Sequence, residues 1–190
     1  MNDVYMEYMV KHKKDTKSKA AVIGIYIFAG LLTIVMGMVI MVGAVALAET
    51  GISQFAFSIG LVLIVFMWYF AIFIAKKFDI EYEYILTNSS LDVDKIMSKS
   101  QRKRVVSLDF TEIEVCANIK DEAHNSAYKR GNEGFKLYDM TGNIDDGGVY
   151  FVDFNGEGTR NRVLFQPTSK MIEAIRKFNP RNIFVYEDRF

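Results

Sequence analysis

Two long uncharged stretches fill most of the first half of the chain, and they constrain its fold more than any other feature. Residues Ala20–Ala48 and Gly51–Ala75 run for 29 and 25 residues without an ionisable Asp, Glu, Lys, Arg or His. About 20 apolar residues are enough for a helix to cross the hydrocarbon core of a bilayer. Because only Glu49 and Thr50 separate the stretches, the sequence predicts a transmembrane helical hairpin over residues 20–75.

Lysines flank this hairpin and indicate its orientation. Those before the first stretch and after the second are Lys11, Lys13, Lys14, Lys17, Lys19, Lys76 and Lys77. Basic residues accumulate on the cytoplasmic side of membrane helices, so we predict a multi-pass protein of the bacterial cytoplasmic membrane with both termini in the cytoplasm. Two alternatives stay open. One is a secretory signal cleaved after Ala46-Leu47-Ala48, whose apolar core is far longer than usual, and the other is a buried helical pair in a soluble protein.

Small residues recur along both stretches. Gly30, Gly37 and Ala44 follow one another at seven-residue intervals, and Ala56 and Gly60 form a small-xxx-small pair. Such residues let two helix backbones approach closely, so these five positions are predicted to form a helix-packing face. The face serves either the hairpin itself or a dimer or partner helix. Neither stretch contains Asp, Glu, Lys, Arg or His, so the sequence does not indicate an ion path or a proton relay.

Residues 1–19 form a basic juxtamembrane segment. Five of its side chains fall near one side of a helix: Met1, Tyr5, Tyr8, Met9 and His12. This arrangement is typical of an amphipathic helix that lies at the membrane interface. An extension of the first transmembrane helix is the alternative interpretation.

Beyond Lys77 the pattern changes to the period of two that is typical of strands. The expected strands are Ile80–Leu86, Leu91–Ile96, Val105–Phe110, Ile113–Ile119, Phe135–Met140, Val149–Phe154 and Arg162–Phe165. Asn155–Gly158 is a favourable hairpin turn, and Gly142–Gly148 interrupts the preceding pair of strands in a similar way. Both connections predict antiparallel neighbours.

The last apolar pattern predicts a helix. Met171, Ile172, Ile175 and Phe178 lie on one helical face between a cap at Pro167–Ser169 and a stop at Asn179-Pro180. Ile183–Tyr186 is a candidate for one more short edge strand. Residues 76–190 are therefore predicted to form an α+β domain, in which a seven-stranded antiparallel barrel is capped by a C-terminal helix.

At this point the chain resembles the bacterial pleckstrin-homology-like (PH-like) domain attached to a two-helix membrane hairpin. Three segments within residues 20–178 support the resemblance: Tyr84-Ile85-Leu86-Thr87, Arg102-Lys103-Arg104 before Val105-Val106-Ser107-Leu108, and Phe165-Gln166-Pro167. The opening Met1-Asn2-Asp3-Val4-Tyr5, with the Lys-rich stretch that follows, is also similar to an uncharacterised family of small bacterial membrane proteins of unknown function. The resemblance implies a fold and a membrane location, and it transfers no catalytic residue.

Composition and motifs disfavour most kinds of chemistry. The chain has 23 basic and 23 acidic residues, which is not the balance of a nucleic-acid-binding protein. One cysteine and two histidines cannot build a disulfide or a typical zinc site, and no phosphate-binding loop is present. We interpret His124 as a loop residue, Cys116 as a strand residue and Asp145-Asp146 as part of a turn, so neither catalytic activity nor a metal or other cofactor is predicted.

One basic stretch stands out: Lys95, Lys99, Arg102, Lys103 and Arg104. It is expected at the connection between the second and third strands of the domain. The stretch is either a solvated loop or a contact with anionic lipid or an acidic protein. Phosphoinositide specificity is not implied, because basic residues of phosphoinositide-binding PH domains usually come from the first strand turn, and Asn88–Ser90 is uncharged.

These observations favour a membrane-anchored cytoplasmic interaction or assembly module without catalytic activity. Its expected partners are the lipid bilayer and either another protein or a second copy of the chain. The alternatives are a module that senses anionic lipid, an accessory subunit of a membrane transporter and, least favoured, a membrane-bound enzyme.

Overall fold

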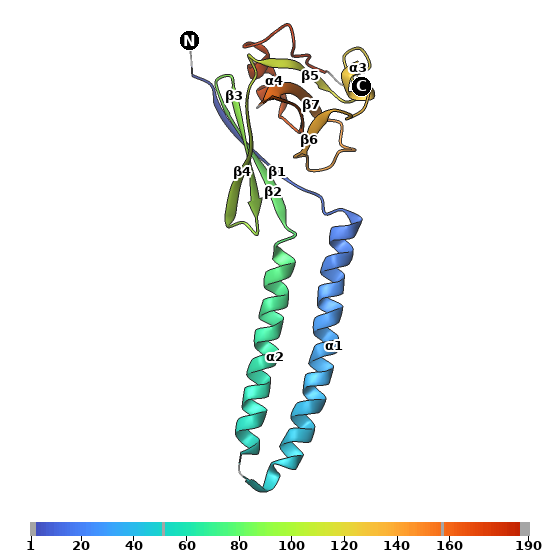
Figure 1. Ribbon diagram of the computed structural model, residues 1–190. Helices are drawn as coiled ribbons and strands as arrows, with labels where there is room; N and C mark the ends of the chain where they lie inside the picture. Colours follow the sequence, from blue (N-terminus) through green and yellow to red (C-terminus); the bar gives the residue numbers. More distant parts are fainter. Residues whose placement is uncertain (1–2, 51, 157, 187–190) are drawn as a thin grey trace. The chain divides into compact units, whose positions relative to one another are not determined.

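The computed structural model describes residues 3–50, 52–156 and 158–186 and divides the chain into two compact units (Figure 1). One unit is the helical segment Lys14–Asp79, and the other combines Met1–Lys13 with Ile80–Phe190. The N-terminal residues therefore belong to the C-terminal domain. This corrects the predicted division into residues 1–19, 20–75 and 76–190, in which they formed a separate juxtamembrane segment.

The helical unit is a hairpin of α1 (Thr16–Ala46), the short 3-10 helix η1 (Ala48–Thr50) and α2 (Ser53–Lys76). The α1 helix begins before the uncharged stretch because Asp15 caps it, accepting a hydrogen bond of 2.8 Å from the Ser18 amide. Both helices are long and apolar enough to cross a membrane. In the most apolar segment of each helix, only 6% (α1) and 11% (α2) of the residues are buried within the chain. So little burial argues against a helical pair from the core of a soluble protein.

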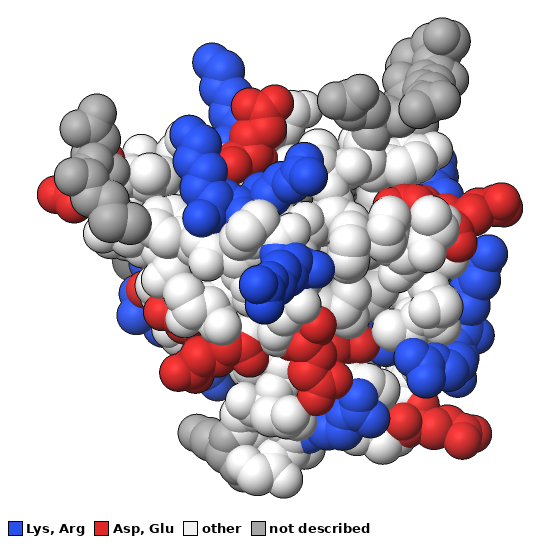
Figure 2. All heavy atoms as spheres, turned by 90° about the horizontal axis from the view of Figure 1, so that it is seen from above, with Lys and Arg blue, Asp and Glu red and all other residues white. Residues whose placement is uncertain are grey.

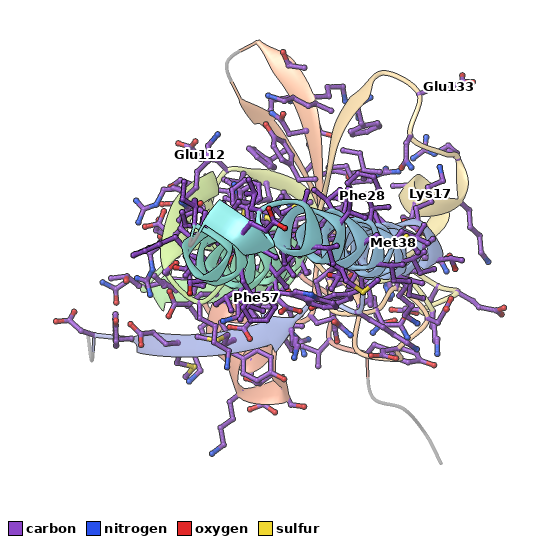
Figure 3. All side chains as sticks on the ribbon, turned by 90° about the horizontal axis from the view of Figure 1, so that it is seen from below. Lys17, Phe28, Met38, Phe57, Glu112 and Glu133 are labelled. Atoms are coloured by element: carbon purple, nitrogen blue, oxygen red, sulfur yellow. The ribbon has the colours of Figure 1, made fainter. Side chains whose placement is uncertain are left out.

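Bulky apolar side chains cover the outside of the hairpin. Figure 3 labels three of them, Phe28, Met38 and Phe57, and each is at least half exposed. The buried positions of the two helices carry small residues instead, namely Ala29, Gly60, Ala71 and Ala75. Small residues at the contact let the two helix backbones approach closely.

The domain contains two four-stranded sheets, and not the seven-stranded closed barrel that the sequence predicted. The first sheet is antiparallel throughout, in the order β1 (Tyr5–Lys11), β2 (Ile80–Thr87), β3 (Ser90–Met97) and β4 (Gln101–Asp109). The seven predicted strands are all present. The eighth strand, β1, is the additional one.

The β1 strand lies where an interfacial helix was expected. It pairs with β2 from Tyr5 opposite Thr87 to Lys11 opposite Glu81, and the side chains of Met6 and Val10 pack against the core. The segment is too short for its helical and strand patterns to be told apart locally. Backbone pairing with β2 and the partial burial of Met6 and Val10 decide in favour of the strand.

The second sheet has the order β5 (Ile113–Asn118), β7 (Tyr150–Gly156), β8 (Thr159–Phe165) and β6 (Phe135–Asp139). The predicted β7–β8 hairpin is confirmed, with Gly156 opposite Thr159 and a positive φ of 74° at Gly158. The predicted antiparallel β6–β7 neighbours are wrong, because β6 pairs in parallel with β8. Because β8 lies between β6 and β7 in the sheet, the connection that contains Gly142–Gly148 has to cross β8 before β7 begins.

The core lies between the sheets and the C-terminal helix α4 (Ser169–Arg176), which confirms the predicted helix. Its Met171, Ile172 and Ile175 side chains are buried, and Thr168 caps it by accepting from the Met171 amide at 3.3 Å. The predicted edge strand Ile183–Tyr186 reduces to a single parallel bridge between Ile183 and Cys116. A short helix, α3 (Ser126–Lys129), interrupts the loop between β5 and β6.

Candidate functional site

The predicted basic stretch is a β-hairpin and not a loop. Lys95 lies on β3, Lys99 lies in the turn, and Arg102, Lys103 and Arg104 lie on β4. Across the two strands Lys95 faces Lys103, while Asp94 faces Arg104. Because neighbouring residues of a strand point to opposite faces, the hairpin separates the two arginines from Lys95 and Lys103.

The arginines are engaged by carboxylates of the same sheet. Arg102 contacts Glu83 at 2.6 Å, and Arg104 contacts Asp92 at 3.1 Å and Asp94 at 3.3 Å. The side chains of Glu83 and Asp94 are only 10% and 7% exposed. A nearly buried carboxylate needs a compensating charge, so both arginines serve the fold of the sheet.

The three lysines differ from the arginines. Among the described residues, no ion pair within 4.0 Å involves Lys95, Lys99 or Lys103. Lys99 is exposed, and it adopts a positive φ of 58° next to Ser98 at 54°. The Ser100 amide donates to the Met97 carbonyl at 3.2 Å, which closes a tight turn of the type that usually contains Asn or Gly.

The predicted helix-packing face is only partly the interface of the hairpin. Gly60 is buried, and a Cβ added there would overlap the side chain of Ile40. Gly30 and Gly37 open onto free space, and Ala44 is half-buried. The side chain of Ala56 lies outside the described part of the chain.

A hydrogen bond that the sequence analysis missed joins the two helices of the hairpin. Trp68 Nε1 donates to Thr33 Oγ1 at 3.0 Å, and this hydroxyl donates to the Ala29 carbonyl at 2.8 Å. The Tyr26 ring stacks on Trp68 with ring centroids 6.4 Å apart. Polar contacts between helices of this kind stabilise packing in a membrane by about 1 kcal/mol.

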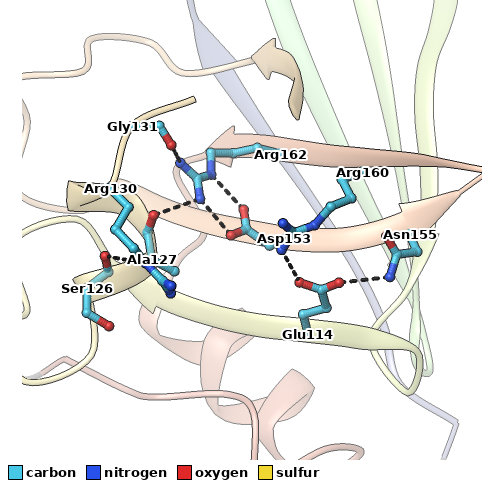
Figure 4. A network of polar contacts seen from close by, with 9 residues as sticks. All are labelled: Glu114, Ser126, Ala127, Arg130, Gly131, Asp153, Asn155, Arg160 and Arg162. Carbon is cyan, nitrogen blue, oxygen red and sulfur yellow. Dashed lines mark hydrogen bonds and ion pairs between the residues drawn. The ribbon is translucent and has the colours of Figure 1, made fainter. Parts of the chain in front are cut away.

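Among the described residues of the domain, Arg162 makes the most side-chain hydrogen bonds, although the sequence indicated it only as the start of a strand (Figure 4). Its side chain is fully buried, and its Nε and Nη2 donate to the two oxygens of Asp153, both at 2.7 Å. The same guanidinium also donates to the carbonyl oxygens of Gly131 at 2.7 Å and Ala127 at 3.0 Å, and to Asn132 Oδ1 at 3.0 Å.

These contacts use all five N–H groups of the guanidinium, and the Phe135 ring lies 4.3 Å from its centre. Arg162 therefore holds the loop around α3 against the second sheet and has no donor left for a ligand. The register of the β7–β8 hairpin brings the pair together, because Gly156 faces Thr159 and, three residues further along each strand, Asp153 faces Arg162. The sequence predicted the hairpin but not this register.

The second sheet also has an exposed ion pair beside this buried one. Arg160 Nη2 donates to Glu114 at 2.9 Å, and Asn155 donates to the other oxygen of the same carboxylate at 2.8 Å (Figure 4). Arg160 and Glu114 are 54% and 37% exposed. Exposed pairs of this kind contribute little to stability.

The side chains considered for catalysis or metal binding, those of Cys116, His124 and Asp146, are buried or contact neighbouring residues of the fold. Cys116 is buried in β5, and burial raises the pKa of its thiol, which opposes formation of the nucleophilic thiolate. His124 stacks on Phe184 with centroids 3.8 Å apart, and its Nδ1 lies 2.8 Å from Asp121. Asp146 accepts from Asn143 at 2.9 Å within the turn before β7. Within the described ranges, no three His, Cys, Asp or Glu side chains form a group that could hold a metal ion.

Charges of both signs are interspersed over the face of the domain seen in Figure 2. A surface of this kind does not produce a strong field of one sign over its whole extent. Charge-based recognition therefore depends on local groups such as the β3–β4 hairpin.

Comparison with known proteins identifies a family for this chain. No curated protein and no solved structure matches the chain. The sequence profile of a family described as "Bacterial PH-like domain (DUF6106)" matches residues 2–185. The matched range includes β1, the helical hairpin, both sheets and α4. The function of this family is unknown, and the chain belongs to it: it is a bacterial PH-like domain protein.

Proposed function

We propose that this chain is a two-span protein of the bacterial cytoplasmic membrane, and that it holds a PH-like domain at the cytoplasmic face as a non-catalytic interaction or assembly module. The observation that carries the proposal is the pairing of β1 with β2. These strands are neighbours in one sheet, but the whole helical hairpin lies between them in the sequence. Two strands that are hydrogen-bonded in one sheet must lie on the same side of a bilayer. The pairing of β1 with β2 therefore supports an even number of membrane crossings between them.

The connections at both ends of the hairpin are short. The His12 amide donates to the Ile80 carbonyl at 2.9 Å, so the residues before α1 and after α2 are bonded to each other. The seven flanking lysines favour the cytoplasmic side for both connections. The domain is therefore tethered twice, which keeps it beside the membrane.

Open strand edges support an interaction role for the domain. The β4 strand ends the first sheet and β6 ends the second, and a cavity lies between them, lined by Val105, Ser107, Tyr138 and others. Edge strands present unpaired backbone groups to which a strand of another chain can add. We expect the partner to be another protein or a second copy of this chain.

Cysteine accessibility in sealed cells tests the topology. Glu49→Cys in the turn between the helices should react with an impermeant thiol reagent, whereas Ser100→Cys on the domain should react only after the membrane is permeabilised. The native Cys116 is buried, so it serves as an internal control for a folded domain. Labelling of Ser100→Cys in sealed cells would contradict the cytoplasmic placement.

Crosslinking in intact cells tests the interaction. A photoreactive residue at Ser107, on the β4 edge, should give a crosslinked product of defined mass, and a second copy of the chain would double the mass. Lys170 on α4 is exposed as well and is the matched control position. Equal crosslinking patterns from both positions would reject a specific interaction at the β4 edge.

A further inference from the structure

The five cations of the β3–β4 hairpin fall into two chemically different sets. Arg102 and Arg104 neutralise carboxylates of their own sheet, at distances of 2.6 to 3.3 Å. Lys95, Lys99 and Lys103 form no ion pair of this kind among the described residues. The available positive charge of the hairpin therefore belongs to its three lysines.

The placement of these lysines is unfavourable in the absence of an anion. Lys95 and Lys103 lie directly opposite each other on neighbouring strands, and like charges in this position repel. Lys99 has a left-handed backbone conformation that residues other than Gly, Asn and Asp rarely adopt. Backbone conformations of this kind cluster at functional sites, and an anion bound beside Lys95 and Lys103 would offset their mutual repulsion.

The end of the hairpin is also close in the chain to the second apolar helix. Met97, the last residue of β3, pairs with Ile80, the first residue of β2. Only three residues separate Ile80 from Lys76 at the end of α2. Such a connection spans at most about 14 Å when fully extended, so a bilayer that contains α2 lies within reach of the lysines.

We propose that Lys95, Lys99 and Lys103 dock the tip of the β3–β4 hairpin on the anionic headgroups of the membrane that contains the chain. This inference rests on the proposed two-span function. Lysine suits such a surface because its ammonium is a compact charge without the directional fork that arginine uses for paired carboxylates. The uncharged turn at Asn88–Ser90 lies at the other end of β2, and the lysine contact needs no specific headgroup.

A fluorescence experiment on the full-length protein in nanodiscs tests the contact. Ser100→Cys carries an environment-sensitive fluorophore, and the discs contain a headgroup-attached quencher in neutral phosphatidylcholine or in mixtures with phosphatidylglycerol. We expect stronger quenching in the anionic discs, which fades between 0.1 and 1 M salt as the Debye length falls from about 10 to about 3 Å. The native Cys116 is buried and is not expected to take up the label.

Two triple variants separate specific from general charge effects. Lys95→Gln, Lys99→Gln and Lys103→Gln together should abolish the difference between neutral and anionic discs, since each lysine shifts the docking equilibrium about 5-fold, equivalent to about 1 kcal/mol per cation. Lys170→Gln, Arg176→Gln and Lys177→Gln remove the same charge from exposed positions on or directly after α4 and should leave the difference unchanged.

The outcomes also separate this inference from the proposed function. Release of the protein from native membranes by alkaline carbonate would contradict the two-span anchor itself. Retention in the membrane together with equal quenching in neutral and anionic discs would overturn the lipid contact alone. Equal effects of the two triple variants would overturn it as well, because net charge and not the hairpin would then be responsible.

Discussion

Replacing Arg162 with Met should strongly destabilise the second sheet. The substitution keeps most of the apolar stem but leaves the carboxylate of Asp153, which is 1% exposed, without its cation. Loss of one partner of a buried ion pair costs about 3–5 kcal/mol. Since about 1.4 kcal/mol corresponds to a factor of ten in an equilibrium constant, the open population should rise about 100-fold to about 4,000-fold.

Cys116 provides the measurement, because it is buried in β5 and becomes reactive only when the sheet opens. The rate of thiol labelling of the full-length protein in membranes should rise by the same factor as long as reclosing is faster than labelling. Arg160→Met is the matched control. Its partner Glu114 is 37% exposed, so the loss should be at most about 1 kcal/mol.

A double variant identifies the cause. Asp153→Leu combined with Arg162→Met removes both charges, and it should label more slowly than Arg162→Met alone, because no charge is then left buried and unpaired. The reasoning is refuted if Arg162→Met labels no faster than Arg160→Met.

Two further substitutions test close backbone packing. Gly60→Leu should lower the thermal stability of the detergent-solubilised protein more than Leu61→Ala does, because its side chain would overlap Ile40 whereas Leu61 is exposed; equal melting temperatures would show that Gly60 is not at the helix contact. Gly142→Ala should raise hydrogen exchange at the Lys13 amide, which donates to the Gly142 carbonyl at 2.7 Å, because the added Cβ would lie 2.6 Å from Val10. Unchanged exchange would mean that the loop shifts without strain.

The individual helices and strands could be predicted from local sequence patterns. The uncharged stretches specify the two apolar helices because a helix satisfies its own backbone hydrogen bonds and needs only length and apolar composition. The alternation of Tyr82, Tyr84 and Leu86 with Glu81, Glu83 and Ile85 specified β2 in the same way, and the first three side chains are buried. Thr168 marked the start of α4 because a hydroxyl at that position caps a helix.

The Arg162–Asp153 pair depends on the exact register of the β7–β8 hairpin. A four-residue turn over the predicted range Asn155–Gly158 would place Asp153 opposite Arg160, whereas in the structure Gly156 faces Thr159 and Asp153 faces Arg162. A tight turn fixes the register of a hairpin, so a shift of the turn by one residue changes which arginine meets the carboxylate. The contacts of Arg162 with the carbonyls of Gly131 and Ala127 also required the tertiary structure, because the path of the α3 loop has no local signature.

The sequence by itself determined the two apolar helices, the seven strands after them and the closing helix, since each depends on periodicity within a few residues. Only the tertiary structure decided that residues 5–11 form β1, that β6 lies parallel to β8, and that Arg102 and Arg104 are bound by Glu83, Asp92 and Asp94. The physical reason is the same in each case. Strand pairing and charge neutralisation join groups from different segments, and their free energy depends on which partner the completed fold brings within a few ångströms.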